Sequence, residues 1–297
     1  MKYQYFPQDP NYKLFRSIRI CFFVILQCET IGNNNIIRNM ITLKTKGCKV
    51  FFAALASIIG YVAWWNVYRI TPLLDLPKHT VINSVAKDLV MVILALMILL
   101  IVLKPKDICS FLGLDSNLLK GFLVAIVSVL PLYIVFPLIG SINQDYSVSL
   151  FIRRCVCPGF FEEFLCRAFM FGLFFRYAKV GFFWATILPA IGFGIMHIYQ
   201  GHDILSSLAA FGVTFLGALY FSWMYVAWNY NLWVPIGLHL LMNTAWGIFN
   251  VTGTEVAAGG LISNIMRIVS ITLAITITVY YHRKKGEKVF DYPVFSF

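Results

Sequence analysis

The chain has 297 residues, of which 60% are hydrophobic and 12% are charged, and its mean hydropathy is +0.78. Soluble domains carry about 25% charged residues, so the composition excludes a soluble domain with one membrane anchor and predicts a polytopic membrane protein. The net charge of +11 would fit nucleic-acid binding in a soluble protein. Here Lys and Arg lie in short loops and tails beside apolar segments, as at the cytoplasmic ends of membrane helices. We therefore expect a bilayer and no nucleic acid among the partners.

Residues 1–40 are the least membrane-like part of the chain. The apolar run 20–26 is too short to cross a bilayer, which takes about 20 residues. We expect 1–40 to be a variable N-terminal extension that is disordered or arises from a mis-assigned start. Residues 41–285 are expected to form a single transmembrane domain, and residues 286–297 a short C-terminal tail.

Eight apolar segments follow, each about long enough to cross a bilayer. They predict an all-α fold, a bundle of about eight transmembrane helices. The connections are short and leave no room for a soluble domain, although 107–119 has room for a short surface helix. The predicted spans are 49–68, 86–103, 120–140, 156–177, 181–200, 204–227, 231–250 and 261–281.

The segment Phe160-Phe161-Glu162-Glu163-Phe164-Leu165-Cys166-Arg167 places two carboxylates and an arginine among apolar residues. Ionised groups inside a membrane are costly without partners or water. Glu163 and Arg167 are four residues apart, so on a helix they share a face and can pair. Glu162 is rotated by roughly 100° from Glu163 and is left for chemistry. Taken alone, the segment also fits a structural ion pair that holds helices together.

Two later segments add further polar groups inside predicted spans. Glu162 lies near the start of the fourth span and His197 near the end of the fifth. Because these spans are antiparallel neighbours with a tight connection, the two side chains should lie at a similar depth. His239 and Asn243 are four residues apart, on one face of the seventh span. Each alone is typical of hydrogen bonding between helices, but together they predict one functional site.

The cysteines, one predicted loop and four glycines also have expected roles in this fold. The cysteines show no zinc pattern, because Cys155-x-Cys157 is too close and lacks a second pair, and we interpret all seven as small apolar residues or free thiols. His202 and Asp203 are expected in a loop. Four glycines are expected to let helices approach closely: Gly192, Gly194, Gly212 and Gly217.

Carboxylate, histidine and amide groups together suffice for peptide hydrolysis. A glutamate can take a proton from water, a histidine can orient that water, and histidine and asparagine on one face can donate to an oxyanion. The same atoms could instead hold Zn²⁺ or another divalent metal, which commonly takes three protein ligands and a water; the ligands would be Glu162, His197 and His239. The sequence contains no His-Glu-x-x-His zinc motif and no glycine-rich phosphate loop.

Three motifs in this order resemble the CAAX protease and bacteriocin-processing family, also called CPBP or Abi. They are Glu162-Glu163-x-x-x-Arg167, Phe193-x-x-x-His197 and His239-x-x-x-Asn243, and the resemblance covers about residues 150–250. It implies an eight-helix, all-α intramembrane endopeptidase. By motif, Glu162 would activate water with the help of His197. His239 and Asn243 would stabilise the oxyanion, and Glu163 and Arg167 would support the site.

The family resemblance implies three kinds of substrate: a CAAX-type peptide, a bacteriocin-like peptide or another membrane-associated peptide or membrane protein. Its members are described both as metalloproteases and as metal-free glutamate peptidases. Two other readings remain open: a non-catalytic immunity or scaffold protein of the same fold that binds a peptide or membrane partner, and a proton-coupled transporter. We expect a multi-pass protein of a bacterial plasma membrane.

Basic residues near the span ends predict the orientation of the chain. If the first span begins inside, twelve Lys and Arg residues lie on inner flanks and six on outer flanks. This bias favours cytoplasmic termini and places Glu162 and His197 toward the outer side. The outer-flank residues are Arg69, Lys78, Lys87, Arg153, Arg154 and Arg267.

Overall fold

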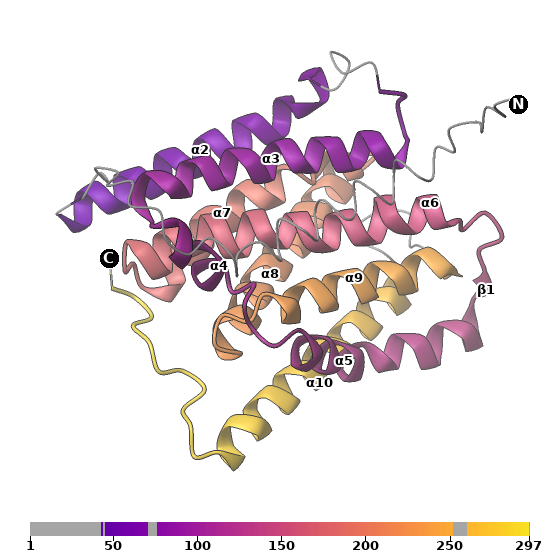
Figure 1. The fold of residues 1–297 in the computed structure, drawn as a ribbon. Coiled ribbons are helices and arrows are strands. Elements are labelled where there is room, and N and C mark those ends of the chain that lie inside the picture. The colour runs from indigo at the N-terminus through magenta and orange to yellow at the C-terminus, as the bar shows by residue number, and fades with distance from the viewer. Residues whose placement is uncertain (1–42, 44, 71–75, 252–259, 297) are drawn as a thin grey trace, which may run out of the picture.

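The structure is a computed structural model that describes residues 43, 45–70, 76–251 and 260–296 (Figure 1). The predicted extension 1–40 lies outside these residues. Within them the fold is all-α, as predicted, apart from one pair of two-residue antiparallel strands, β1 (Ser141–Ile142) and β2 (Phe249–Asn250). The α-helices are α2 (Lys46–Ile70), α3 (Val81–Val102), α4 (Pro105–Leu112), α5 (Leu118–Ile139), α6 (Val148–Phe151), α7 (Phe182–Ile195), α8 (Ile204–Ala227), α9 (Trp233–Ile248) and α10 (Leu261–Lys284).

Helix α6 continues without a break to Tyr177, and we call the segment 148–177 the central helix. Its backbone hydrogen bonds span five residues instead of four: Cys157 donates to Ile152, Gly172 donates to Arg167, and Ala178 donates to Leu173 at 2.9 Å. These are π-helical turns, which are wider than those of an α-helix. They occupy η3 (Ile152–Val156), η4 (Pro158–Glu162), η5 (Phe164–Phe171) and η6 (Leu173–Tyr177).

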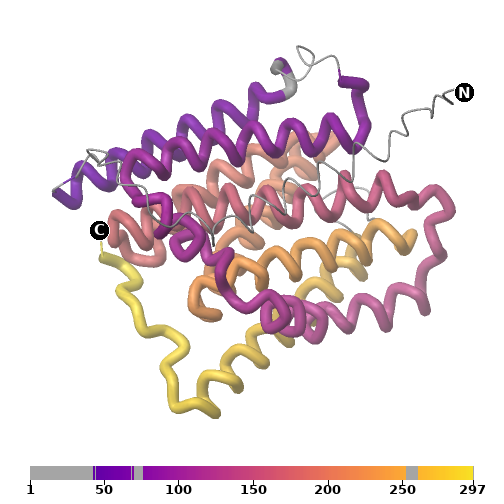
Figure 2. Tube along the Cα trace, in the orientation of Figure 1, coloured from indigo at the N-terminus to yellow at the C-terminus, as the bar shows by residue number. Residues whose placement is uncertain are grey.

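The central helix is enclosed by the rest of the fold. Every residue from Glu163 to Phe175 is buried. A helix that is apolar on all sides lies either in a protein core or in lipid, and here neighbouring helices cover it. The α2–α3 pair lies on one side of it and α9 on the other (Figures 1 and 2), and α7 and α8 also pack against η5.

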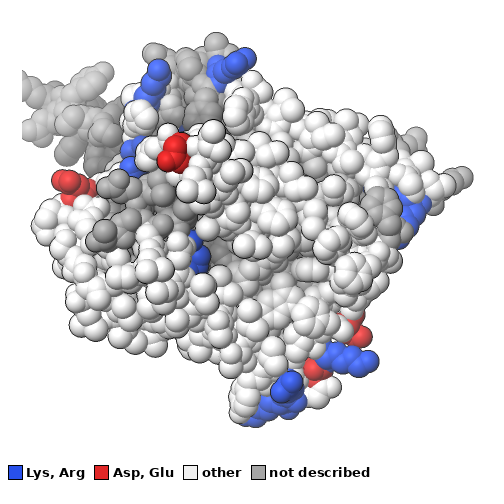
Figure 3. Space-filling model, turned by 180° about the vertical axis from the view of Figure 1, so that it is seen from behind, with Lys and Arg blue, Asp and Glu red and all other residues white. Residues whose placement is uncertain are grey.

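Five helices in the described part of the chain are long and apolar enough to cross a membrane: α2, α3, α5, α8 and α10. Most of the face in Figure 3 is uncharged, with Lys, Arg, Asp and Glu mainly at its edges. This supports an integral, multi-pass membrane protein.

The other three predicted spans form helices with different bounds. The fourth begins at Val148, eight residues before the predicted position. The fifth and seventh are shortened to the 14-residue α7 and the 16-residue α9. Helix α7 ends because 198–200 form a tight 3₁₀ turn, η7 (Ile198–Gln200), with an extended Gly201 after it. Helix α9 ends because its next two residues pair with β1.

The C-terminal tail folds back onto the start of α7. The first amide groups of a helix lack partners within the helix. Phe182 and Phe183 donate theirs to the carbonyls of Pro293 and Val294, each at 2.9 Å. The Tyr292 ring packs 5.3 Å from that of Phe182. The tail therefore caps α7 instead of ending freely beyond α10.

Close approaches test the expectations for small residues. A Cβ added at Gly192 would collide with Tyr61, and one added at Gly194 would lie 2.7 Å from Phe211, so these glycines do allow close packing. The same expectation was wrong for Gly212 and Gly217, which have open space around the Cβ position. The interpretation of the cysteines was wrong for Cys109, which is disulfide-bonded.

Candidate active site

A cavity of about 740 Å³ opens beside the central helix. Its walls come from α2, α3, the central helix, α7 and the turn after it, α8, α9 and α10, so it draws on most of the fold. Of the six site residues predicted from the sequence, five line this cavity, and Glu163 lies behind its wall. The five lining residues are Glu162, Arg167, His197, His239 and Asn243.

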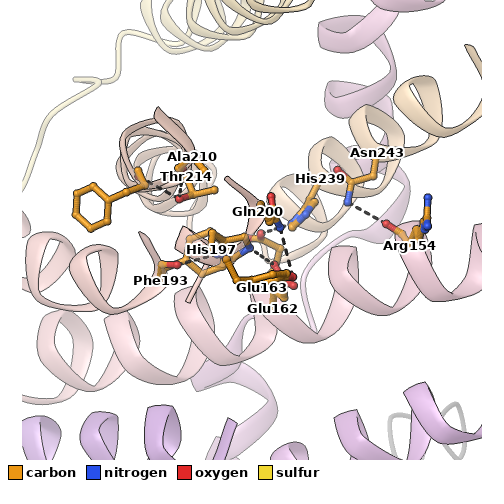
Figure 4. Close-up of polar contacts among 12 residues, drawn as sticks. Arg154, Glu162, Glu163, Phe193, His197, Gln200, Ala210, Thr214, His239 and Asn243 are labelled. Atoms are coloured by element: carbon orange, nitrogen blue, oxygen red, sulfur yellow. Dashed lines mark hydrogen bonds and ion pairs between the residues drawn. The ribbon is translucent and has the colours of Figure 1, made fainter. Parts of the chain in front are cut away.

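Glu162 and His197 lie next to each other in the cavity lining (Figure 4). The His197 Nδ1 lies 2.7 Å from the Phe193 carbonyl oxygen. Because a carbonyl only accepts, Nδ1 carries the proton and Nε2 is directed to Glu162. The Nε2 to Oε2 distance is 4.0 Å, too long for a direct hydrogen bond and suited to a water that contacts both groups. The two side chains lie close together, as expected from their predicted similar depth.

Glu163, behind the cavity wall, contacts two predicted residues that line the cavity, Arg167 and His239. Its Oε2 lies 3.1 Å from Arg167 Nε, and its Oε1 accepts a hydrogen bond from His239 Nδ1 at 2.7 Å. Glu163 and Arg167 are 0% and 1% exposed, so this pair interacts without water. The Arg167 guanidinium lies between the rings of Phe193 and Phe221, 4.9 and 5.3 Å from their centres.

Glycines bring the central helix and α9 close enough for these contacts. A Cβ at Gly159 would lie 2.9 Å from Leu240 Cβ, so only a glycine lets this turn rest against α9. The same contact holds Asn243 near the central helix, where its Nδ2 donates to the Arg154 carbonyl at 3.1 Å. His239 and Asn243 thus share the cavity, as their spacing predicts, but each already has a partner on the central helix.

Several lining residues were missed as site residues in the sequence. Asp88 comes from α3, and Gln200 from the turn after α7. Lys87, Arg153, Arg154 and Arg267 were interpreted only as outer-flank charges, yet all four line the cavity. The available signal was a charge inside a predicted span, which usually marks a wet cavity. It applied to Lys87, Asp88 and Arg267, whereas Arg153 and Arg154 precede the predicted fourth span.

Asp203 has a structural role instead. It begins α8 as a capping box with Ser206, whose amide donates to the Asp203 carboxylate at 2.7 Å. Hydrogen bonds from the Ser206 amide and hydroxyl lower the pKa of Asp203 below its usual value. The placement of Asp203 in a loop was therefore correct, and its carboxylate is engaged by its own helix.

The donors proposed for a metal are dispersed. Among the residues that the structure describes, no three His, Cys, Asp or Glu side chains are grouped closely enough to hold an ion. Glu162, His197 and His239 are therefore not grouped as a three-ligand site among the described residues.

Comparison with known proteins finds a family match over the residues of this site. Residues 144–245 match the family described as type II CAAX prenyl endopeptidase Rce1-like. We call residues 144–245 the Rce1-like segment. A protein of Bacillus subtilis (strain 168), described as "Putative membrane peptidase YdiL", is 31% identical over 104 residues. That alignment covers 35% of this chain and 38% of the relative, so the chain spans well under half of the relative's length.

All six predicted site residues lie inside the Rce1-like segment, whereas Asp88, Lys87 and Arg267 lie outside it. The resemblance inferred from the three motifs is confirmed over this segment. At the level of the family, the two matches support a membrane protease.

Proposed function

We propose that this protein is an intramembrane endopeptidase in which Glu162 activates a water molecule. The observation that carries the proposal is the Glu162–His197 pair, held 4.0 Å apart at the cavity wall inside the Rce1-like segment. The substrate we propose is a membrane-associated peptide, of CAAX type or bacteriocin-like, and the membrane is that of a bacterium, as for the matched relative.

In the proposed reaction, water lies between Glu162 and His197. Glu162 accepts one water proton while the water oxygen bonds to the scissile carbonyl carbon. His197 Nε2 accepts a hydrogen bond from the other water proton and thereby orients the attack. The tetrahedral intermediate then breaks its carbon–nitrogen bond, and Glu162 passes its proton to the leaving amine. The products are a carboxylic acid and an amine, and Glu162 returns to its starting form.

In this proposal, His239 and Asn243 stabilise the oxyanion of the tetrahedral intermediate. His239 Nδ1 donates to Glu163, so its Nε2 can donate to an oxyanion only when the ring carries both protons. The Glu163 carboxylate contacts Nδ1 of that ring and also pairs with Arg167. Glu163 and Arg167 therefore act through His239 and do not contact the substrate. Asn243 can offer the second N–H of its side-chain amide.

The test is cleavage by the purified full-length protein in lipid nanodiscs. Prenylated peptides that end in a Cys-aliphatic-aliphatic-X sequence, their unprenylated counterparts and a mixture of apolar peptides are incubated and read by mass spectrometry. We expect cleavage by the wild type and a loss of at least a hundredfold in Glu162→Gln and His197→Ala, because general base catalysis contributes about 10²–10⁴-fold.

The matched control is Glu287→Gln, which removes a carboxylate that is half exposed and pairs with His282 at the far end of α10. It should keep full activity. If Glu162→Gln cleaves as fast as the wild type, the hydrolytic mechanism is wrong. A binding or scaffold role for the same cavity would then explain the fold.

A further inference from the structure

The cavity carries more positive than negative charge among the described residues. Five cations line it, against two carboxylates, Asp88 and Glu162. Arg167 is balanced by Glu163 behind the wall, which leaves four cations facing two carboxylates. A ligand with a negative group would therefore be favoured here. The five cations are Lys87, Arg153, Arg154, Arg167 and Arg267.

The wide turns of the central helix align two of these cations with Glu162. Cavity-lining residues recur at intervals of four along it as the pairs 153–154, 157–158 and 161–162, and Leu165 and Arg167 follow. Arg153 and Glu162 are nine residues apart, which makes two and a half turns of an α-helix and would place them on opposite sides. The π-type hydrogen bonds from 152 onward put more residues in each turn, so both side chains face the cavity.

Of the two cations aligned with Glu162, Arg153 is the better placed to bind a ligand. Its Nε is buried and has no hydrogen-bond partner in the described structure. A buried guanidinium N–H without a partner is costly, and an incoming carboxylate would satisfy it. A guanidinium binds a carboxylate through two parallel hydrogen bonds. Arg154 beside it is exposed, also lines the cavity and adds a second positive charge.

We infer that Arg153 binds the free C-terminal carboxylate of the peptide substrate, an assignment that rests on the proposed hydrolysis. Arg153 lies about two of these wider turns from Glu162 along one face, or roughly 10 Å at roughly 5 Å per turn. An extended peptide rises about 3.3 Å per residue. A chain end held at Arg153 thus places a bond roughly three residues from the terminus beside Glu162. Arg153 is a specificity-determining residue in this reaction, and it does no acid–base chemistry.

The first experiment measures cleavage of two peptides that differ only at the terminus. One ends in a carboxylate and the other in a carboxamide, and both are based on a peptide that the wild type cleaves. We expect the wild type to prefer the acid by roughly ten- to a hundredfold in kcat/KM, the size of a hydrogen bond to a charged group. Arg153→Gln should lose this preference mainly through KM and still cleave the amide. Arg153→Lys should restore part of the preference.

The second experiment measures binding without catalysis. N-acetyl-Ala-Val-Leu, as free acid and as carboxamide, is added to the detergent-solubilised full chain, and the Tm is recorded. The free acid should raise the Tm of the wild type and of Glu162→Gln, and it should fail to do so in Arg153→Gln. The matched control is Arg69→Gln, an exposed outer-flank cation that does not line the cavity, which should behave as the wild type.

The outcomes separate this inference from the proposed function. Equal cleavage of acid and amide by the wild type, or an acid preference retained in Arg153→Gln, would overturn the role of Arg153 and leave the hydrolysis intact. A Tm rise with inorganic phosphate as large as with the free acid would show a general anion site and also overturn it. Undiminished cleavage by Glu162→Gln together with an Arg153-dependent acid preference would overturn the mechanism and leave the subsite standing.

Discussion

Arg167→Met should destabilise the protein more than any other single change in the site. The substitution keeps most of the side-chain volume and removes the charge from a pair that is 1% and 0% exposed. Breaking a buried ion pair by removing one partner costs about 3–5 kcal/mol, because the remaining charge is left in a low dielectric. The contacts of the guanidinium with Phe193 and Phe221 add about 0.5–2 kcal/mol. His239 still contacts Glu163, so the lower end of the range is expected.

The assay is thermal unfolding in detergent, with Glu163→Gln and the double variant measured beside Arg167→Met. A loss of about 3 kcal/mol lowers the Tm by roughly 10 °C at the 2–4 °C per kcal/mol typical of domains of 150–250 residues. The double variant should unfold at a higher temperature than Arg167→Met, since it no longer buries an unpaired charge. A Tm change of less than 2 °C in Arg167→Met, or strictly additive effects in the double variant, would refute the reasoning that this pair is a desolvated unit.

Three further predictions address the cavity, the tail and metal. Gly217 and Gly212 both have open space around the Cβ position, but only Gly217 lines the cavity. Gly217→Leu should therefore lower kcat/KM by at least tenfold, whereas Gly212→Leu should not. Equal effects of the two substitutions would contradict this assignment. Deleting 292–297 should lower the Tm by several degrees, because the start of α7 loses hydrogen bonds worth about 1 kcal/mol each; an unchanged Tm would show that the tail cap is dispensable. Elemental analysis should find far less than one zinc per chain, equally in His197→Ala, because the donors are not grouped; stoichiometric zinc that disappears in this variant would contradict the geometry.

Contacts that depend on neighbouring sequence were predictable. Glu163 and Arg167 pair because four residues are close to one helical turn, whether the turn is α or π. Glu162 and His197 meet because two successive antiparallel helices must return to the same depth, and their distance of 4.0 Å agrees with that argument. The apolar spans follow from composition alone, because a bilayer demands about 20 apolar residues. For these features, the spacing of residues and the order of the segments along the chain are enough to predict which groups lie close together.

Contacts between distant segments were not predictable in the same way. The hydrogen bond from His239 to Glu163 joins residues 76 apart, and spacing within α9 alone could pair His239 only with Asn243. The contribution of Asp88 from α3 to the cavity likewise depends on how the helices pack. The spacing of residues along a helix predicts which of them share a face, but it does not predict which other helix that face contacts.

The sequence by itself determined the membrane class, the helical segments and the set of polar residues that must avoid lipid, because these follow from hydrophobicity and from the cost of buried charge. Only the tertiary structure decided which carboxylate pairs with which histidine, since that choice depends on how closely α9 rests on the central helix at Gly159. It also decided the helical period, because π-type hydrogen bonds place Arg153 and Glu162 on one cavity face where a period of 3.6 residues would separate them.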